Sequence, residues 1–162
     1  MSTTLFQAKP YDPQRERRKK IRWITTIVVI IIVAALGWHL RYWQYEHRVN
    51  LFFDSLQRAS AAQSEAEKQK NYEQAYAIWM NDPNWKQHPQ QYRDYPYGSF
   101  YLDWGPGGEW GLVKTHKVIG TVPPPTKGSG TGVIVGIIVN DRAEQCHIWV
   151  EKKDKTMHPS PY

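Results

Sequence analysis

An uncharged apolar run from Trp23 to Leu40 constrains this chain more than any other feature of its sequence. As a helix, its 18 residues would extend about 27 Å, close to the thickness of the hydrocarbon core of a bilayer. The β-branched centre of the run suits lipid, where the backbone has to satisfy its own hydrogen bonds. The run therefore predicts a transmembrane helix over residues 21–40, with the lipid bilayer as its partner.

The charges on either side of this run predict which way the helix crosses the membrane. Six Lys or Arg residues lie between Arg15 and Arg22, whereas only Arg41 and Arg48 closely follow the run. Because positive charge favours the cytoplasmic side, the N-terminus is expected inside and the rest of the chain outside. The expected membrane-interface residues are the basic and aromatic side chains at the two boundaries: Arg18, Lys19, Lys20, Arg22, Trp23, Trp38, Tyr42 and Trp43.

A cleaved signal peptide is the alternative interpretation of the same segment, since Ala35-Leu36-Gly37 resembles a cleavage site. The 22 residues before the run are long for a signal peptide, and the bulky Trp38 directly follows the candidate site. The sequence favours an uncleaved anchor and leaves cleavage open. Residues 1–20 are then expected to be a disordered, basic cytoplasmic tail. The expected location is a bacterial inner membrane, crossed once, with the C-terminal domain in the periplasm.

Most of the formal net charge of +6 belongs to the membrane segment and its tail, which hold seven Lys or Arg residues and two acidic ones. After Leu40, fourteen Lys or Arg residues are balanced by thirteen Asp or Glu residues. A nucleic-acid-binding domain would need basic residues clustered on its globular part, so no nucleic-acid partner is expected. The chain has one cysteine, Cys146, which cannot form an intramolecular disulfide. The outer domain therefore has to be held together by packing.

Two helices are predicted at the start of the outer domain, which is expected to span residues 41–157. Apolar residues between Tyr42 and Ala59 recur at three- and four-residue steps, as in an amphipathic helix that continues from the membrane segment. A second helix is predicted around Tyr72–Trp79. Asp82-Pro83 should end it, because proline disfavours helix in the residue before it.

Four strands are predicted next, a short one at 99–104 and longer ones at 109–122, 132–140 and 145–153. Helices followed by consecutive strands predict an α+β fold: a single N-terminal transmembrane helix, then helices packed on a curved antiparallel sheet. Residues 158–162 should form a flexible C-terminus. The candidate core residues are apolar side chains of these elements: Phe52, Phe53, Leu56, Tyr76, Trp79, Ile134, Ile138 and Trp149.

The motifs predict no catalytic, metal-binding or cofactor-binding residue. The glycine-rich stretch 128–132 lacks the Lys-Ser/Thr ending of a phosphate loop and precedes a strand instead of a helix. The histidines have neither the spacing nor the companions of metal ligands. No Ser or Cys nucleophile lies beside a recognisable base.

Three carboxylates, those of Asp94, Asp103 and Glu109, lie among aromatic residues and allow two interpretations. In an aromatic pocket such a group can act as a general acid or base. The other interpretation is that these residues cap turns or pair with Arg93 and Lys114. The sequence leaves both open and favours the structural role.

The segment from Trp85 to Trp110 is the most unusual part of the composition, because aromatic residues alternate there with Pro and Gly turns. Turns limit how many rings can enter one core, and Trp and Tyr are enriched at protein interfaces. The expected partner-binding residues are the exposed rings of this segment: Trp85, Tyr92, Tyr95, Tyr97, Tyr101, Trp104 and Trp110. A membrane or periplasmic protein is the expected partner, and homo-oligomerisation stays open.

The order of elements resembles the NTF2-like and cystatin-like group of α+β domains. The stretches VNLFFDSLQRA (49–59) and KNYEQAYAIW (70–79), followed by the strands between Trp110 and Lys153, carry this resemblance. It implies a sheet that wraps around the helices. Members of the group range from enzymes to scaffolds, and the catalytic Asp/His pairs of its enzymes have no clear counterpart here. A weaker likeness is to the single-span oxidase-assembly factors, which also place a small α+β domain after one membrane helix.

Two functions follow from these observations. The first is a membrane-anchored, non-enzymatic binding or assembly domain outside the membrane, which contacts a protein partner through its aromatic surface. The alternative is a small-molecule-binding or enzymatic NTF2-like pocket domain tethered to the membrane. Carboxylates that face inward among aromatic rings would favour the pocket, whereas rings on a flat outer patch would favour the protein contact.

Overall fold

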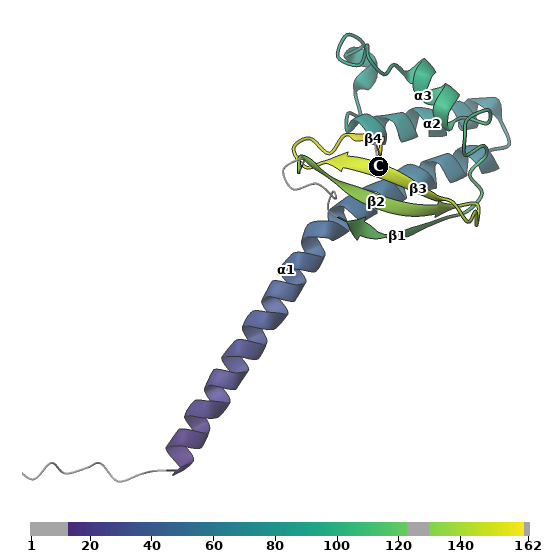
Figure 1. The fold of residues 1–162 in the computed structure, drawn as a ribbon. Helices are drawn as coiled ribbons and strands as arrows, with labels where there is room; N and C mark the ends of the chain where they lie inside the picture. The colour runs from purple at the N-terminus through teal and green to yellow at the C-terminus, as the bar shows by residue number, and fades with distance from the viewer. Residues whose placement is uncertain (1–12, 123–129, 161–162) are drawn as a thin grey trace, which may run out of the picture. The chain divides into compact units, whose positions relative to one another are not determined.

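The computed structural model describes residues 13–122 and 130–160, which form an α+β fold (Figure 1). Its elements follow the chain in this order: α1 (Pro13–Ala61), α2 (Glu65–Met80), the 3-10 turn η1 (Trp85–Gln87), α3 (Tyr97–Trp104), β1 (His116–Val122), β2 (Gly132–Val139), β3 (Gln145–Glu151) and β4 (Met157–Pro159). The chain divides into two compact units, Met1–Leu40 and Arg41–Tyr162.

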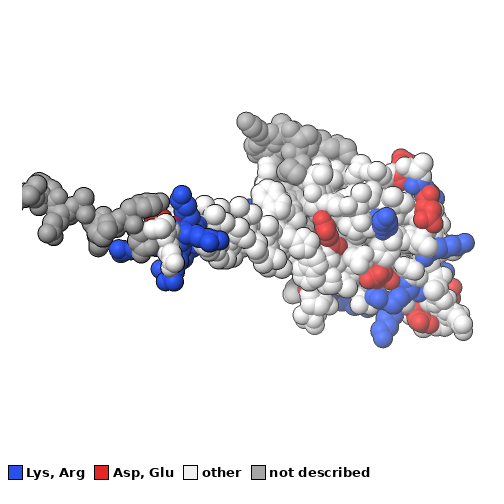
Figure 2. All heavy atoms as spheres, turned by 90° about the horizontal axis from the view of Figure 1, so that it is seen from below, with Lys and Arg blue, Asp and Glu red and all other residues white. Residues whose placement is uncertain are grey.

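The first unit contains the part of α1 before Arg41. This part is long and apolar enough to cross a membrane, by length and composition, and its apolar window has no buried residues. The hydroxyls of Thr25 and Thr26 donate to the carbonyls of Ile21 and Arg22, both at 2.9 Å, so these polar groups need no water. Figure 2 shows Lys and Arg gathered at the start of α1, while both signs of charge mix over the second unit.

Helix α1 begins at Pro13, so the basic block is helical where a disordered tail was expected up to residue 20. Proline is favoured at the first position of a helix, and Arg and Lys are good helix formers. The rest of the expected tail, residues 1–12, lies outside the described residues, as do Pro161 and Tyr162 of the expected flexible C-terminus. The prediction of a flexible end is wrong for His158 and Pro159, which lie in strand β4 and pair with β3.

The second unit buries the apolar stripe that α1 carries after Arg41. Val49, Phe52 and Phe53 are fully buried, and Leu56 and Ala59 are 1% exposed. Helix α2 follows after a short break, with the Ser64 hydroxyl accepting a bond from the Glu67 N–H at 3.2 Å. It ends at a left-handed cap, Asn81, directly before Asp82-Pro83.

Helix α3 stands where a short strand was predicted. Aromatic residues have a high strand propensity, but tertiary packing overrides it here. Pro96 precedes the first turn, and the i,i+4 spacing of Phe100 and Trp104 places both rings on one helical face. Both rings contact Phe52 of α1, at centroid distances of 6.1 and 5.0 Å.

Strands β1 to β4 form one antiparallel sheet in chain order. Strand β1 begins at His116, later than the predicted start at residue 109, because residues 105–111 fold into turns. Strand β3 ends at Glu151, slightly before the predicted end. The expected curvature is absent, and the sheet is uncurled. One register shift is present in the ladders, between Val118 and Gly120 of the edge strand β1, and bulges and glycine kinks are the usual source of sheet curvature.

Side chains of β2 and β3 alternate between two faces. Val133, Val135, Ile137 and Val139 belong to the core cluster with the helical aromatics. The predicted core residues Ile134 and Trp149 pair on the opposite face instead, and Ile138 beside them is only partly buried. Trp149 covers Gly132 so closely that any Cβ there would overlap the indole ring. Ile134 and Trp149 are buried as predicted, at 6% and 8% exposure, but they do not belong to the core cluster that contains the helical aromatics.

His116 connects strand β1 to helix α1. Its ring stacks on Phe53 at 5.6 Å, its Nε2 lies 2.9 Å from Asn50 Oδ1, and its Nδ1 lies 3.2 Å from Gln57 Oε1. Burial lowers the pKa of His116, and the nearby carboxylate of Asp54 opposes that shift. The neutral ring is therefore favoured in the folded domain.

Replacement of the ring at the centre of these contacts tests the core. Phe53→Ala is expected to lower the free energy of unfolding by about 3–5 kcal/mol, because it removes a fully buried ring and leaves a cavity. Chemical denaturation of the full chain in a mild detergent measures this change. Leu102→Ala, at a side chain that is 74% exposed, is the control and should change the stability by less than about 0.5 kcal/mol. Equal effects of the two changes would place Phe53 outside the core.

Candidate functional site

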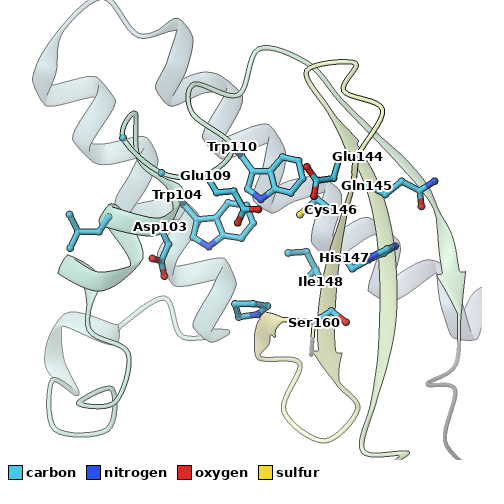
Figure 3. Close-up of a pocket in the computed structure, with 14 residues that line it drawn as sticks. Asp103, Trp104, Glu109, Trp110, Glu144, Gln145, Cys146, His147, Ile148 and Ser160 are labelled. Carbon is cyan, nitrogen blue, oxygen red and sulfur yellow. The ribbon is translucent and has the colours of Figure 1, made fainter. Parts of the chain in front are cut away.

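A cavity of about 680 Å³ lies in the second unit, between the end of α3 and strand β3 (Figure 3). One wall is formed by residues 102–110, and the other by residues 144–148 together with Pro159 and Ser160. Its volume falls in the range of small-molecule sites in proteins. Segments separated by about forty residues in the sequence therefore meet at one concave site.

Tight turns after α3 shape the first wall. The N–H of Gly105 donates to the Tyr101 carbonyl at 2.8 Å, and the N–H groups of Gly108 and Gly111 continue the series at 3.0 Å. A Cβ at Gly105 would overlap the Tyr101 carbonyl, and one at Gly108 would overlap the Asp103 carbonyl. Only glycine fits at these two close approaches, which explains two of the four glycines of the DWGPGGEWG stretch.

The turn between β2 and β3 holds this wall in place. Asn140 and Asp141 both have positive φ angles, as in the tight turns of β-hairpins. The Asn140 side chain accepts a bond from the N–H of Lys114 at 2.7 Å and donates to the Leu112 carbonyl at 2.9 Å. Arg142 donates to the Glu109 carbonyl at 3.0 Å. These bonds tie the hairpin that precedes β3 to Glu109 of the first wall and to the residues that follow that wall.

Two tryptophans line the cavity from the first wall. Trp104 is 6% exposed and packs edge-on against Phe52 and Phe53, at centroid distances of 5.0 and 5.8 Å. Trp110 is 8% exposed, and the guanidinium of Arg142 lies 5.4 Å from its ring centroid. Both rings are thus rigidly held, with part of each bordering the cavity.

The indole nitrogen of Trp104 is buried and has no hydrogen-bond partner among the described residues. Figure 3 shows it directed into the space that Asp103 also borders. The Tyr95 hydroxyl lies in the same region and donates to Asp103 Oδ2 at 2.7 Å. Burial and this bond raise the pKa of Tyr95, and an interaction with the Trp104 N–H opposes the rise. The indole nitrogen is therefore directed at the Tyr95 hydroxyl.

Three carboxylates border the cavity from different segments: Asp103 from α3, Glu109 from the following turns, and Glu144 from the approach to β3. None of them forms an ion pair with any residue in the described part of the chain. Within the same residues, no group of His, Cys, Asp or Glu is arranged to hold a metal ion. The cavity therefore carries uncompensated negative charge spread over its rim.

Cys146 borders the cavity from β3, with its sulfur toward Glu109 (Figure 3). Burial raises the pKa of this thiol to about 12, and the nearby charge of Glu109 adds to the shift. The protonated thiol is a poor nucleophile and a poor metal ligand. The side chains of Gln145 and His147 point away from the cavity, as the alternation of a strand requires.

Five of the seven predicted partner-binding aromatics line two separate cavities. Trp104 and Trp110 line the large cavity, whereas Trp85, Tyr92 and Tyr97 border a smaller one of about 260 Å³. Tyr95 packs on Trp79 and Phe100, and Tyr101 lies edge-on to Tyr72 at 5.0 Å and is 37% exposed. The rings therefore contact one another more than they cover a flat outer surface.

The predicted membrane-interface residues lie along α1. Trp23 and Trp38 are 71% and 67% exposed, as are most of the apolar residues between them. After Leu40, Tyr42 is partly buried, and Trp43 stacks on His47 at 4.8 Å. The four basic residues at the other boundary are exposed on the helix surface: Arg18, Lys19, Lys20 and Arg22.

Sequence reasoning did not place Glu144, Cys146, Ile148 and Ser160 at a site. The sequence signal that could have indicated one wall is the DWGPGGEWG stretch, which is rich in glycine and tryptophan. Two of its glycines, Gly105 and Gly108, lie too close to backbone carbonyls for a side chain to fit. No sequence signal pairs that stretch with β3.

Comparison with known proteins finds no matching family model, no matching curated protein and no matching solved structure. The resemblance to NTF2-like and cystatin-like domains therefore stays a prediction, and the chemistry of the site has to carry the functional argument.

The buried thiol at the cavity wall gives a direct test of the site's geometry. Cys146 is expected to resist alkylation by iodoacetamide at pH 8 in the folded protein and to react fully in urea, because the thiol is 4% exposed and has a pKa of about 12. Mass spectrometry measures the modified fraction. The control is Gly107→Cys, in open space on the cavity rim, which should react in the folded state. Equally fast labelling of both sites would contradict the described wall.

Proposed function

We propose that this protein is a single-pass membrane protein whose domain after Leu40 binds a ligand in the cavity between α3 and β3, without catalysis. The observation that carries this proposal is the convergence of two buried tryptophans and three carboxylates on one cavity. Inward-facing carboxylates among aromatic rings were the feature expected to favour a pocket over a flat protein-binding patch. The preformed walls support binding with little reorganisation.

The chemistry of the lining supports binding over catalysis. The thiol of Cys146 is protonated at neutral pH, since its pKa is about 12. Asp103 is engaged by the Tyr95 hydroxyl, and Glu109 faces that thiol. Burial and the charge of Glu109 raise the pKa of the thiol and so disfavour the thiolate, which is the nucleophilic form.

The membrane part of the proposal rests on the apolar window of α1 and the basic block before it. Because the positive charges are in excess before the apolar run, the N-terminus lies in the cytoplasm and the binding domain lies outside. If the membrane is a bacterial inner membrane, the binding domain is in the periplasm. Anchoring confines the domain to the membrane surface, so the domain encounters its ligand there.

A topology reporter tests this orientation. A reporter that is active only outside the cytoplasm, fused after Tyr162, is expected to be active in a bacterial host. Neutralising Arg15–Lys20 and adding lysines after Trp43 should reverse the orientation, because the balance of positive charge is then inverted. Reporter activity and protease accessibility measure the result. An unaltered chain with its reporter in the cytoplasm would overturn the orientation.

A second candidate function is contact with a protein partner through the smaller cavity. Trp85, Tyr92 and Tyr97 border it together with Pro89 and Pro96, and half-buried aromatics of this kind are typical of interface anchors. The ring of Trp85 stacks on Tyr97 at 5.3 Å, so the anchor is held in place.

A pair of glycine variants separates the two candidates. Gly107→Phe puts a ring at the rim of the large cavity without a Cβ clash, whereas Gly98→Phe, equally unobstructed on α3, is the control away from it. We expect Gly107→Phe to abolish most binding in a ligand-observed NMR screen of cationic, neutral and anionic fragments, with the full chain in nonionic detergent. Gly98→Phe should leave binding unchanged. Unchanged binding in Gly107→Phe, with copurifying protein lost in Trp85→Ala, would favour the second candidate instead.

A further inference from the structure

We propose that the lysine-rich turn between β3 and β4 contacts anionic lipid headgroups of the membrane that α1 is proposed to span. This inference rests on the membrane part of the proposed function and adds a second contact between lipid and the domain after Leu40. Three features carry it: the place of the turn beside the first residues of that domain, the lysine contact that fixes it there, and its positive charge.

The turn lies beside the part of α1 that directly follows the apolar run. The Lys155 ammonium donates to the Tyr45 hydroxyl at 3.0 Å and lies 4.2 Å from the centroid of the Tyr45 ring. Tyr45 is buried and comes five residues after Leu40 in the same helix. At 1.5 Å per residue this is about 8 Å beyond the end of the apolar run, close to the outer edge of the headgroup region of a bilayer. Lysine side chains near the turn are long enough to reach back to the headgroups.

The backbone of the turn presents Lys155 to the helix. The Lys155 N–H donates to the Glu151 carbonyl at 3.1 Å, and the Glu151 N–H donates to the Thr156 carbonyl at 2.9 Å. Lys155 has a φ of 63°, in the left-handed region that favours glycine. A lysine nevertheless occupies this position, and its side chain reaches Tyr45 from there. The turn is therefore fixed to α1 by a side-chain contact as well as by the sheet.

The turn carries positive charge without an ion-pair partner. Lys152 and Lys153 are exposed, and the Lys152 ammonium donates to a neutral acceptor, the Gly130 carbonyl, at 2.8 Å. Among the described residues, no ion pair involves either of these lysines or Lys155. Anionic lipids attract basic residues that lie within about a Debye length of their surface. The charge of the turn therefore favours a membrane surface that contains anionic lipid.

The two carboxylates of the turn are hydrogen-bonded to neighbouring residues. Glu151 Oε1 accepts a bond from the Trp149 indole N–H at 2.7 Å. Asp154 Oδ1 accepts bonds from the N–H and the hydroxyl of Thr156, at 3.0 and 2.7 Å. The Lys153 ammonium, in contrast, has no partner among the described residues. The lysines are thus the groups of the turn that are available to an external anion.

A further lysine lies near the same part of α1. Lys117 of β1 borders a groove together with Trp43 and His47, and Glu46 borders it too and offsets one charge. Trp43 is 50% exposed, and tryptophan is enriched at membrane–water interfaces. Basic side chains from β1 and from the turn therefore approach the first helical turns after Leu40, where an interfacial aromatic ring is also present.

Fluorescence quenching in lipid nanodiscs that hold the full chain tests the contact. Thr131→Cys places a bimane label beside the turn, because the Thr131 carbonyl accepts the Lys152 N–H at 2.7 Å. The quencher is phosphatidylcholine with a nitroxide on its headgroup, in discs of phosphatidylcholine alone or with about 30% phosphatidylglycerol. We expect quenching to be about twofold stronger in the discs with phosphatidylglycerol. About 0.5 M NaCl should remove this difference, since salt screens the attraction.

A second label position is the control for distance from the membrane. Ala143→Cys is exposed in the turn between β2 and β3, at the opposite end of the antiparallel sheet. Its label should be quenched weakly in both kinds of disc. Mass spectrometry confirms that the label is on the introduced cysteine, because Cys146 is buried.

Charge variants assign the effect to the turn. Lys152→Gln combined with Lys153→Gln should remove more than about half of the extra quenching by phosphatidylglycerol discs, because two of the attracted charges are lost. The matched control combines Lys70→Gln with Lys114→Gln, two exposed lysines outside the turn. This control lowers the net charge by the same amount and should leave the quenching unchanged.

Several results would overturn the inference. These are quenching at Thr131→Cys that is independent of phosphatidylglycerol, equal quenching at Ala143→Cys, or unchanged quenching in the Lys152 and Lys153 double variant. Glycerol 3-phosphate that removes the quenching more effectively than NaCl at equal ionic strength would also overturn it, because the turn would then bind a single phosphate group and not a lipid surface. In all these cases the proposed membrane anchoring stands. If the full chain does not enter the discs, the membrane part of the proposed function fails, and this inference fails with it.

Discussion

The edge-on packing of Trp104 against Phe52 and Phe53 is the interaction on which the domain after Leu40 depends. The chain has one cysteine and no disulfide, so only packing can hold α3 to α1. The same rings bring the end of α3 close to the sheet, and residues 105–111 then turn back along the core. Loss of this contact would loosen the core and one wall of the cavity together.

The second constraint is the tie between that wall and the sheet. Asn140 and Arg142 are placed by a hairpin turn, and both donate to carbonyls of the segment after α3. These bonds are already present in the folded domain and hold the cavity open. Few side chains would therefore lose conformational freedom when a ligand binds. A site of this kind favours binding of a ligand whose charge complements the rim.

The proposed membrane anchoring and the proposed ligand binding are physically compatible. The apolar window of α1 is unsuited to water, and the charge of the domain after Leu40 is nearly balanced. The negative rim of the cavity is therefore a local feature and not a consequence of overall composition. Local charge of this sort steers small cations, and its effect should weaken as salt rises.

The sequence by itself determined the features that depend on local pattern. These are the apolar helix, the stripe with Phe52 and Phe53, the end of the second helix before Pro83, and the three long strands, because periodicity and proline chemistry act over a few residues.

Tertiary structure alone decided the rest. Residues 99–104 form a helix because this places the rings of Phe100 and Trp104 against Phe52, which lies about fifty residues earlier in the chain. Ile134 and Trp149 pair on the face of the sheet opposite the core cluster. Strand β2 is buried on both faces, so its apolar sequence does not indicate which face meets the helices. The cavity likewise joins Glu109 to Cys146 through packing that no local pattern encodes.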